Sequence, residues 1–491
     1  MRFKVRDIDI SAGDLFIVLL NKKDADKLNL IALDRVRIRN KKEIICVVDI
    51  YEGWKKVKEG EVGLFEEVLK EIGVRNGEIV DVVPVEKPII LEYIRKKLDG
   101  KNLEREEING IIKSILKNEL TEIERTYFVS GCYVHGLSLD ESYYLTMAIV
   151  NNSKRLDFGK KIIVDKHSIG GVPGNRTTMI VVPILVAAGL TVPKTSTRNI
   201  TSVSGTSDTM EVLAKVDFNA KEIKEIVNKV GGCMVWGGAL ELASADDRLI
   251  KIERPLSLDP KGIMLASIMA KKKSVGATHV IIDLPFGEGS KLKDMGEAIK
   301  LKSKFIELGG KLGIKVKIMI SDGTQPVGNG VGPCLESIDV LNVLLNKGPE
   351  DLKEKSIKMA SDVFEMLGYK NSRKKALEIL ESGKAYEAME RIIKAQKGKI
   401  FRPEQIKLGK FKYNVKAKTK GRVKSLDNKL INKIGMVLGA PRDKGAGIYF
   451  NFKKNSKVNK NDLLFTLYSN SEEKLKNSLE ILEKKSFIKI E

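Results

Sequence analysis

The feature that most constrains the fold is a pattern that occurs four times between residues 160 and 400. Each copy has a short apolar run, then a polar loop rich in glycine or hydroxyl groups, then a helical segment. The runs with their loops begin "KIIVDKHSIGG", "VPKTSTRNITS", "THVIIDLPFGEGS" and "KVKIMISDGTQPVGNG". Strands that alternate with helices predict a largely parallel α/β sheet. Ligands bind such sheets at the carboxyl ends of the strands, where these loops would lie.

The pattern changes on both sides of this region, so we expect a multidomain α/β protein. Short β-branched runs predict a β-rich N-terminal domain at 1–85. Helical apolar spacing predicts a helical domain at 86–158. We also expect part of 245–275 to join this domain in space. A central, mostly parallel α/β domain with Gly-rich loops would span 159–405, and a C-terminal α+β domain 406–491.

The composition is that of an ordinary globular protein, since 42% of the 491 residues are hydrophobic and 31% are charged. The longest apolar stretch, Met179 to Val192, is too short to span a membrane and is interrupted by Pro183 and Gly189. The N-terminal "MRFKVRDIDISAGD" has no signal-peptide core. The four cysteines lack paired spacing, which predicts isolated thiols. We therefore expect a cytoplasmic protein.

The formal net charge of +22 favours anionic partners, either nucleic acid or phosphorylated small molecules. Along most helices, however, basic and acidic residues alternate, as in "EMLGYKNSRKKALEILESGKAYEAMERIIK", which is typical of a solvated, ion-paired surface. The sequence has no aromatic cluster, zinc knuckle or arginine-rich tail for RNA. We therefore expect no specific nucleic acid partner, although a basic RNA-binding protein with a vestigial site remains an alternative.

The first loop, "KHSIGGVPGN", combines a lysine and a serine with three glycines. Glycines let backbone N–H groups approach a ligand, and the helix that follows points its positive end at the same place. Lys166 would supply a charge for phosphate, and Ser168 a hydroxyl donor. The order of these residues excludes a Walker loop. Taken alone, the loop fits a structural turn equally well, with His167 packed beneath it.

The second loop also carries many hydrogen-bond donors. They surround Gly205 and precede a helical segment that contains Asp208 and Glu211. Two such loops at neighbouring strand ends could hold two anionic groups or grip one from two sides. The donor residues of this loop are Thr197, Arg198, Asn199, Thr201, Ser202, Ser204, Thr206 and Ser207.

Two later segments carry further candidates. Asp259 precedes Pro260 in "SLDPKGIMLAS", a pattern that favours a helix N-cap for the aspartate. The following helix would carry Ser267 and a lysine triplet that starts at Lys271, which fits a solvated face. Lys291 is more suggestive of a binding site, because it lies just past "GEGS" at the end of a third strand.

The sequence has no Gly-x-Ser-x-Gly elbow, no histidine pair at metal spacing and no carboxylate cage for a cation. We therefore expect no metal, no cofactor and no covalent nucleophile. The residues by themselves indicate an enzyme for phosphate-bearing small molecules and leave its reaction open.

Several motifs occur in a fixed order along the chain. "DKHSIGGVPGN" is followed by "STRNITSVSGTSDTMEVL", then by "ASIMAKK", "SDGTQPVGNGVG" with "LNKGPEDL", and "VLGAPRDKGAGIYF". This order resembles the thymidine and pyrimidine-nucleoside phosphorylase family, whose signature matches residues 197–200 and 205–211. The resemblance covers the chain from about residue 90 to its end.

Four departures separate this chain from the bacterial members of that family. It has Gly-Val-Pro-Gly-Asn at 171–175 in place of Gly-Val-Gly-Asp, and Asn199 and Ser204 in place of Gly-rich residues. "IKIERPLSLDP" replaces the segment with their pyrimidine-reading arginine, and they lack the N-terminal domain. All four features are similar to the archaeal branch, which acts on nucleoside 5′-monophosphates.

The resemblance implies phosphorolysis, in which AMP and phosphate give adenine and ribose 1,5-bisphosphate, with CMP and UMP as further candidate substrates. It implies phosphate at Lys166 and Ser168 and a proton donated to the leaving base by Asp259. Because an isolated aspartic acid is ionised at neutral pH, this role requires Asp259 to be desolvated or close to negative charge. The implied AMP-binding residues are Gly171, Thr197, Arg198, Asn199, Ile200, Thr201, Ser202, Thr206, Ser267 and Lys291.

Two other enzymes remain as alternatives. A pyrimidine-nucleoside phosphorylase would not require the 5′-phosphate, and a phosphoribosyltransferase would need pyrophosphate and Mg²⁺. The relatives dimerise through their helical domain, and the N-terminal domain of the archaeal branch is associated with larger assemblies. The resemblance therefore implies a homodimer that builds larger homo-oligomers, with phosphate as a co-substrate and no membrane partner.

Overall fold

The computed structural model describes residues 1–491 except 14, 54, 87, 199–202, 241–243, 254 and 257, and except the side chains of 239, 240, 244, 246 and 247. The chain forms two compact units. The first contains Met1–Asn152 and Ala243–Ser267, and the second contains Ser153–Leu242 and Ile268–Glu491. In the part of the chain that is described, no helix is long and apolar enough to cross a membrane.

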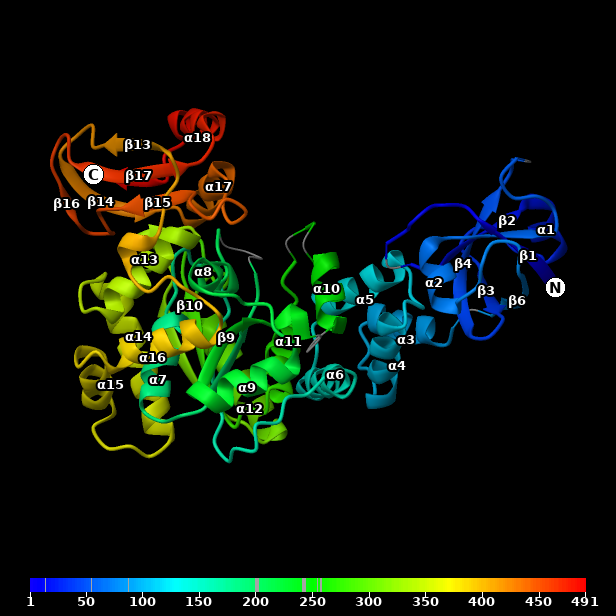
Figure 1. The fold of residues 1–491 in the computed structure, drawn as a ribbon, viewed down its shortest axis with the longest axis horizontal. Helices are drawn as coiled ribbons and strands as arrows, with labels where there is room; N and C mark the ends of the chain where they lie inside the picture. Colours follow the sequence, from blue (N-terminus) through cyan, green and yellow to red (C-terminus); the bar gives the residue numbers. More distant parts are fainter. Residues whose placement is uncertain are drawn as a thin grey trace. The chain divides into compact units, whose positions relative to one another are not determined.

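The first unit begins with β1 (Arg2–Asp7), β2 (Ile17–Asn21), α1 (Lys22–Lys27), β3 (Arg35–Arg39), β4 (Glu43–Tyr51), β5 (Glu61–Leu64), α2 (Glu66–Ile72) and β6 (Ile79–Val85). The strands form a closed barrel in the order β1-β5-β2-β4-β3-β6 (blue in Figure 1). β1 closes it by pairing with β5 in parallel and with β6 antiparallel. Alternate residues point inward, so Phe3, Val5, Val18 and Leu20 are buried in the core. The β-rich N-terminal domain is confirmed.

One segment of the barrel differs from its sequence pattern. "EGEVGLFEEVLKEIGV" looks helical throughout, but only Glu66–Ile72 is helix, and Glu61–Leu64 is strand β5. β5 pairs with both β1 and β2, which buries Val62 and Leu64 completely. Pairing with distant strands therefore overrides the local helical pattern.

The first unit continues with α3 (Ile90–Leu98), α4 (Arg105–Leu116), α5 (Glu122–His135), α6 (Leu139–Asn151), α10 (Ser244–Glu253) and the start of α11 (Lys261–Ser274). Capping boxes begin α5, through Thr121 and Glu124, and α6, through Ser138 and Glu141. Lys97 Nζ donates to Glu141 Oε1 at 2.8 Å in a buried pair that ties α3 to α6. α10 packs against α4, α5 and α6, so a segment distant in sequence completes the helical part.

Five strands lie at the centre of the second unit: β7 (Val164–Ser168), β8 (Val192–Ser196), β9 (Gly232–Trp236), β10 (His279–Phe286) and β11 (Lys315–Asp322). One sheet has the order β11-β10-β7, β8 pairs with β9, and a bridge from Ile163 to Thr191 joins β7 to β8. All these pairings are parallel, which confirms the mostly parallel α/β domain. The carboxyl ends of these strands therefore share one edge, where the loops begin.

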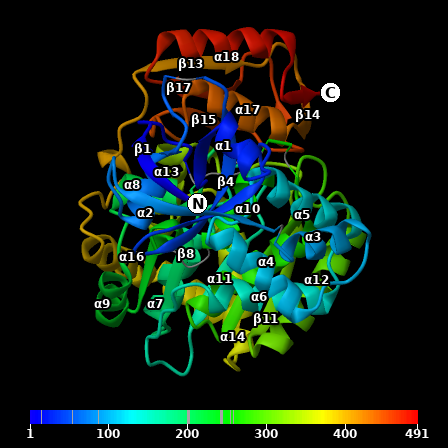
Figure 2. The same cartoon turned by 90° about the vertical axis from the view of Figure 1, so that its right-hand side faces the viewer.

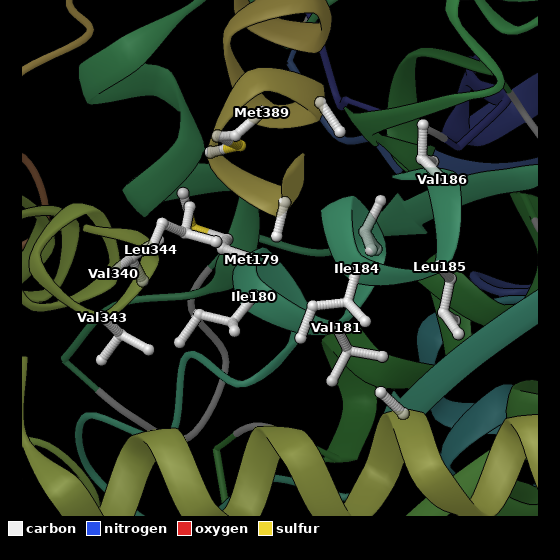
Figure 3. Packing of buried hydrophobic residues seen from close by; sticks show 14 of the residues in the cluster. Met179, Ile180, Val181, Ile184, Leu185, Val186, Val340, Val343, Leu344 and Met389 are labelled. Atoms are coloured by element: carbon white, nitrogen blue, oxygen red, sulfur yellow. The ribbon is translucent and has the colours of Figure 1, made fainter. Parts of the chain in front are cut away.

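Helices surround this sheet: α7 (Thr178–Ala187), α8 (Thr206–Leu213), α9 (Ala220–Val230), α12 (Met295–Leu312), α13 (Pro333–Leu344), α14 (Glu350–Met366), α15 (Ser372–Glu381) and α16 (Lys384–Ala395). α7 lies in the core, because Thr178 to Val186 are all buried. Figure 3 shows Met179 of α7 close to Leu344 of α13 and Met389 of α16. A helix that is apolar on every side is stable only when other elements pack around it. The first loop therefore leads into a helix that is fixed by packing on all sides.

The C-terminal part contains β13 (Phe411–Lys416), β14 (Gly421–Leu426), α17 (Asn428–Leu438), β15 (Gly447–Phe450), β16 (Lys457–Val458), β17 (Leu463–Ser469), α18 (Glu472–Lys484) and β18 (Ile488–Ile490). One sheet has the order β12-β15-β17-β13 and takes β12 (Gly330–Val331) from the segment before α13. The other has the order β16-β14-β18. α18 lies beside β13 and β17 (Figure 2). The predicted C-terminal α+β domain is confirmed.

Candidate active site

The first loop turns sharply after β7. Gly170, Gly171 and Gly174 have φ angles of 85°, 90° and 80°, a conformation that side chains with a Cβ rarely adopt. At Gly174 space is also limiting, because a Cβ there would lie 2.1 Å from Val327 O. Both conformation and packing therefore explain the glycines of this loop.

Asp283 organises the polar groups beneath the first loop. It lies on β10 opposite Ser168 of β7, and its side chain is fully buried. It accepts hydrogen bonds from Ser168 Oγ at 3.1 Å, from Asn175 Nδ2 at 3.2 Å and from Ser321 Oγ at 2.6 Å. Lys355 Nζ lies 2.9 Å from its Oδ2 atom. One carboxylate thus fixes side chains from the first loop, β11 and α14.

Lys166, on the same strand as Ser168, is 1% exposed. Burial lowers the pKa of Lys166 to about 7, although the charge of Asp283 acts in the opposite direction. Burial would also raise the pKa of Asp283, but the charges of Lys355 and Lys166 outweigh it and hold that pKa below its ordinary value. Lys166 therefore loses its proton more readily than an exposed lysine, and a bound anion would favour its charged form.

A second buried charge cluster lies one residue earlier on β7. Asp165 is fully buried, with Lys272 Nζ at 2.8 Å and Lys194 Nζ at 3.6 Å. Burial and the charge of Lys272 hold the pKa of Lys194 well below its ordinary value, against the charge of Asp165. Burial, followed by the charges of Lys272 and Lys194, does the same to the pKa of His167, so this imidazole is neutral. A solvated face was one of two interpretations of the lysine triplet, and it does not hold for Lys272, which is 1% exposed.

The carboxyl end of β7 therefore lies among more cations than carboxylates. The charged side chains here are the buried Lys166, Lys194 and Lys272 and the partly exposed Lys355, with Asp165 and Asp283 as their anionic partners. A buried excess of lysines over carboxylates is unfavourable unless a lysine gives up its proton or an anion joins the group.

Arg176 connects the first loop to the second. Its Nε atom lies 3.0 Å from Gly174 O and 2.7 Å from Glu336 Oε2. Its terminal nitrogens donate to Thr206 Oγ1 at 3.1 Å and to Ser204 O at 2.9 Å. The two donor-rich loops are therefore held together, as expected for loops that follow neighbouring strands.

Arg198, in the second loop, is bound to carboxylates. Its two terminal nitrogens each lie 2.8 Å from an oxygen of Glu211, and one lies 3.3 Å from Asp217 Oδ2. Its guanidinium carbon lies 5.0 Å from the centre of the Trp236 ring. The hydrogen bond from Arg198 and a second one from Lys444 lower the pKa of Glu211 to about 2. Arg198 is thus compensated within the protein, and its contact with AMP stays a prediction.

The remaining candidates in the second loop are only partly described. Thr197 O accepts a hydrogen bond from Ser207 N at 3.4 Å, which links the two ends of the loop. Thr206 is the first residue of α8 and contacts Arg176, as stated above. The predicted AMP-binding residues Asn199, Ile200, Thr201 and Ser202 lie outside the described residues.

The third loop brings Lys291 next to the first. A Cβ on Gly171 would lie 3.2 Å from Lys291 N and 3.3 Å from Lys291 Cγ. The third loop is closed by hydrogen bonds from Gly287 N to Leu292 O at 2.9 Å and from Ser290 Oγ to Gly287 O at 2.8 Å. Gly171 and Lys291, both assigned to AMP by the resemblance, are therefore neighbours.

Asp259 and Ser267 belong to the first unit. α11 begins at Lys261, and Pro260 O accepts a hydrogen bond from Met264 N at 2.9 Å. The residue directly before the helix is Pro260. Asp259 therefore lies one residue ahead of the N-cap position that the sequence pattern predicts for it. Ser267 is in the middle of α11 and is 8% exposed.

Several polar residues of this region were not predicted. Asp283 carried a readable signal, because it interrupts the apolar run "VIIDLPF" and a buried charge in a strand needs partners. The others look like ordinary loop or helix-surface residues in the sequence. The residues that were missed are Asn175, Arg176, Asp283, Glu336 and Lys355.

The described residues contain no group of three or more His, Cys, Asp or Glu side chains placed to hold a metal ion. All four cysteines are buried and free, as predicted. What the strand ends do offer is lysines, hydroxyls and backbone N–H groups, which suit the oxygens of phosphate groups.

Family models match three segments of the chain. The helical bundle domain of a glycosyl transferase family matches residues 91–153, and the a/b domain of that family matches 160–260. The pyrimidine nucleoside phosphorylase C-terminal domain matches 422–489.

Curated relatives match almost the whole chain. The AMP phosphorylase of Thermococcus sibiricus is 44% identical over 484 residues, which cover 98% of this chain and 96% of the relative. The AMP phosphorylase of Pyrococcus furiosus is 44% identical over 496 residues, covering 100% and 98%. That of Methanocaldococcus jannaschii is 42% identical over 494 residues, covering 99% and 97%.

A solved structure, the anthranilate phosphoribosyltransferase (TrpD) of Thermus thermophilus, is similar with a TM-score of 0.54. The match covers 62% of this chain and 99% of that chain at 15% identity, so it shows a shared fold alone.

Proposed function

This chain belongs to the AMP phosphorylase family, and on that premise we propose that it cleaves AMP with inorganic phosphate into adenine and ribose 1,5-bisphosphate. The resemblance inferred from the loop motifs is confirmed, and the relatives named above come from archaea. The pyrimidine-nucleoside phosphorylase alternative is not favoured, because those full-length relatives are AMP phosphorylases. The chain is a glycosyltransferase of the pentosyltransferase type.

The observation that carries the phosphate assignment is the excess of buried positive charge at the end of β7. Lys166 is buried and its pKa is lowered to about 7, so an anion beside it would favour its charged form. Ser168 donates its hydroxyl to Asp283 in this structure. A bound phosphate would compete for that hydroxyl, and Asn175 Nδ2 would continue to stabilise the carboxylate.

AMP would lie across the loops that Arg176 and Lys291 bring together. Gly171 allows the first loop to approach the third, and Thr206 contributes a hydroxyl at the start of α8. The amino end of that helix suits the 5′-phosphate of AMP. The other residues proposed to bind AMP are Thr197, Arg198, 199–202 and Ser267.

In the proposed reaction a phosphate oxygen bonds to C1′ of the ribose as the bond from C1′ to N9 of adenine breaks. The electron pair of that bond leaves with adenine, which takes up a proton from Asp259. General acid catalysis of this kind typically contributes ~10²–10⁴-fold. Phosphate is consumed as a co-substrate, so we propose that no cofactor or metal is needed.

The test is formation of ribose 1,5-bisphosphate from AMP and phosphate, with adenosine, CMP, UMP and uridine in parallel and EDTA present. We expect phosphate-dependent adenine release from AMP but not from adenosine, because the loops would bind both anionic groups. Turnover of uridine without AMP turnover would assign the chain to the nucleoside phosphorylases. RNA binding that weakens with salt, with no turnover, would support the RNA-binding alternative.

We propose that the enzyme is cytoplasmic and assembles as a homodimer that builds larger homo-oligomers through the N-terminal barrel. Deletion of residues 1–84 is then expected to lower the mass measured by light scattering. An unchanged mass would contradict the assembly role of the barrel.

A further inference from the structure

Helix α17 of the C-terminal domain turns two asparagines toward the protein interior. Asn428, Asn432 and Gly435 are spaced by four and three residues, so they lie on one face of the helix. Asn428 is 0% exposed and Asn432 is 8% exposed, whereas Lys433 is exposed. Buried polar side chains normally have specific partners. The partner of Asn432 lies in the second loop, and the partner of Asn428 Nδ2 lies in the loop after β11, beside the third loop.

Asn428 contacts Gly323, in the loop that follows β11, and packs against Gly289 of the third loop. Its Nδ2 atom donates to Gly323 O at 2.8 Å, and Gly323 N in turn donates to Phe286 O at 2.8 Å. A Cβ on Gly289 would lie 3.1 Å from Asn428 Cβ, so the two backbones pass at close range. Gly289 is two residues from Lys291, which means that Asn428 supports the turn that presents this lysine.

Asn432 contacts the second loop. Its Oδ1 atom accepts a hydrogen bond from Val203 N at 3.2 Å. One turn later on the same face, a Cβ on Gly435 would lie 2.6 Å from Val203 Cγ2, so α17 also packs tightly there. Val203 directly precedes Ser204, whose carbonyl is held by Arg176. α17 therefore fixes the second loop from one side and Arg176 from the other.

We propose that Asn428 and Asn432 are positioning residues for AMP, through which the C-terminal domain holds the third loop near Lys291 and the second loop at Val203. This inference rests on the proposed function. Both asparagines act on loop backbone and not on the substrate. Within the described residues, neither is hydrogen-bonded to Lys166 or Ser168, which are assigned to phosphate. Their replacement should therefore raise the KM for AMP and leave the KM for phosphate unchanged.

Asn428 donates its hydrogen bond and Asn432 accepts one, so replacement by aspartate is expected to affect the two positions differently. Asn428 is a donor, and Asn428→Asp keeps the shape of the side chain but removes the donor and places a buried carboxylate against the Gly323 carbonyl. Asn432 is an acceptor, and Asn432→Asp keeps an acceptor, whereas Asn432→Leu does not. We expect Asn428→Asp and Asn432→Leu each to raise the KM for AMP about tenfold. The first leaves the Gly323 carbonyl, beside the third loop, without its donor, and the second leaves Val203 N of the second loop without its acceptor. Asn432→Asp should remain close to the wild type.

The experiment measures kcat and both KM values, together with the thermal unfolding of each variant, in the full chain. Lys433→Gln, on the exposed face of α17, is the matched control and should change nothing. A loss of thermal stability or kcat with an unchanged KM for AMP would mean a merely structural role and overturn the proposal. Equal effects of Asn432→Asp and Asn432→Leu would overturn the role of the acceptor. Failure of the proposed function would show differently, as a wild-type protein that does not turn over AMP.

Discussion

Two clusters of charged residues in the second unit are built in opposite ways. The β7 cluster is buried except for Lys355, which is partly exposed, and it contains more lysines than carboxylates. Its members are Lys166, Lys194, Lys272, Lys355, Asp165 and Asp283. The Arg198 cluster is partly exposed and contains more carboxylates than cations; its members are Arg198, Lys444, Asp208, Glu211 and Asp217.

The difference indicates which cluster is completed by a ligand. Burial lowers the pKa of Lys166 to about 7, which means that the fold destabilises its own cation there. In the Arg198 cluster the hydrogen bond from Arg198 lowers the pKa of Glu211 to about 2, which means that the fold stabilises the charges it contains. Buried groups with a strongly shifted pKa, such as Lys166, are typical of functional sites. The β7 cluster is therefore expected to govern catalysis, and the Arg198 cluster to shape the second loop.

The role of the β7 cluster in phosphorolysis can be tested most directly at Lys166. Lys166→Met removes the buried cation, and we expect phosphorolysis to fall on the order of 10²-fold, as when one preorganised donor is lost from an oxyanion site. The measurement is ribose 1,5-bisphosphate formation at increasing phosphate concentrations. Lys161→Met, at an exposed lysine shortly before β7, is the control. Equal activity of the two variants would remove the β7 cluster from the mechanism.

A smaller effect is expected from pH. Because the pKa of Lys166 is lowered to about 7, the free enzyme loses this proton as the pH rises through neutrality. Phosphate favours the protonated lysine, so its affinity should weaken by up to ~tenfold per pH unit above about 7. Calorimetry of phosphate binding over this range checks the prediction.

The matched variant for the pH prediction is Lys166→Arg, since a guanidinium stays protonated throughout. The ionisation of phosphate itself affects both proteins equally, so their difference isolates the lysine. Identical pH profiles for the wild type and this variant would contradict the assignment.

The smallest effect concerns stability in the Arg198 cluster. The pKa of Glu211 is lowered from 4.5 to about 2, so this group contributes stability above pH 4.5 that is lost as the pH falls toward 2. Glu211 is partly exposed and screened by solvent, so Glu211→Gln should lower the free energy of unfolding at neutral pH by only ~1 kcal/mol. The difference from the wild type should vanish near pH 2.

Urea unfolding at both pH values measures this effect. Glu378→Gln, which removes one partner of an exposed pair with Lys374, is the control and should have less effect at either pH. A Glu211→Gln variant as stable as the wild type at neutral pH would show that the cluster does not stabilise the fold.

The parts of the fold that the sequence predicts are those set by local patterns. β-branched runs followed by glycine and hydroxyl residues indicate parallel strands with their loops at one edge. This geometry is enough to bring Gly171 and Lys291 together, although they are distant in the sequence. The positions of Lys166 and Ser168 at the end of β7 follow from the same pattern.

The rest depends on contacts between distant segments. Lys272 looks like one of three surface lysines, and only the rotation of α11 relative to β7 places it against Asp165. Arg176 looks like an ordinary loop residue until Glu336 and Thr206 meet it from other helices. The sequence around β5 has a helical pattern, and the strand forms only because it pairs with β1 and β2, which are distant along the chain.

The closed barrel at the N-terminus has a consequence for how copies of this protein would associate. Each of its six strands is paired on both sides, so the described strands offer no open row of backbone N–H and C=O groups. A neighbouring copy cannot extend this sheet with a strand of its own. Any contact made by the described strands with a neighbouring copy would instead depend on side chains, which single substitutions can change.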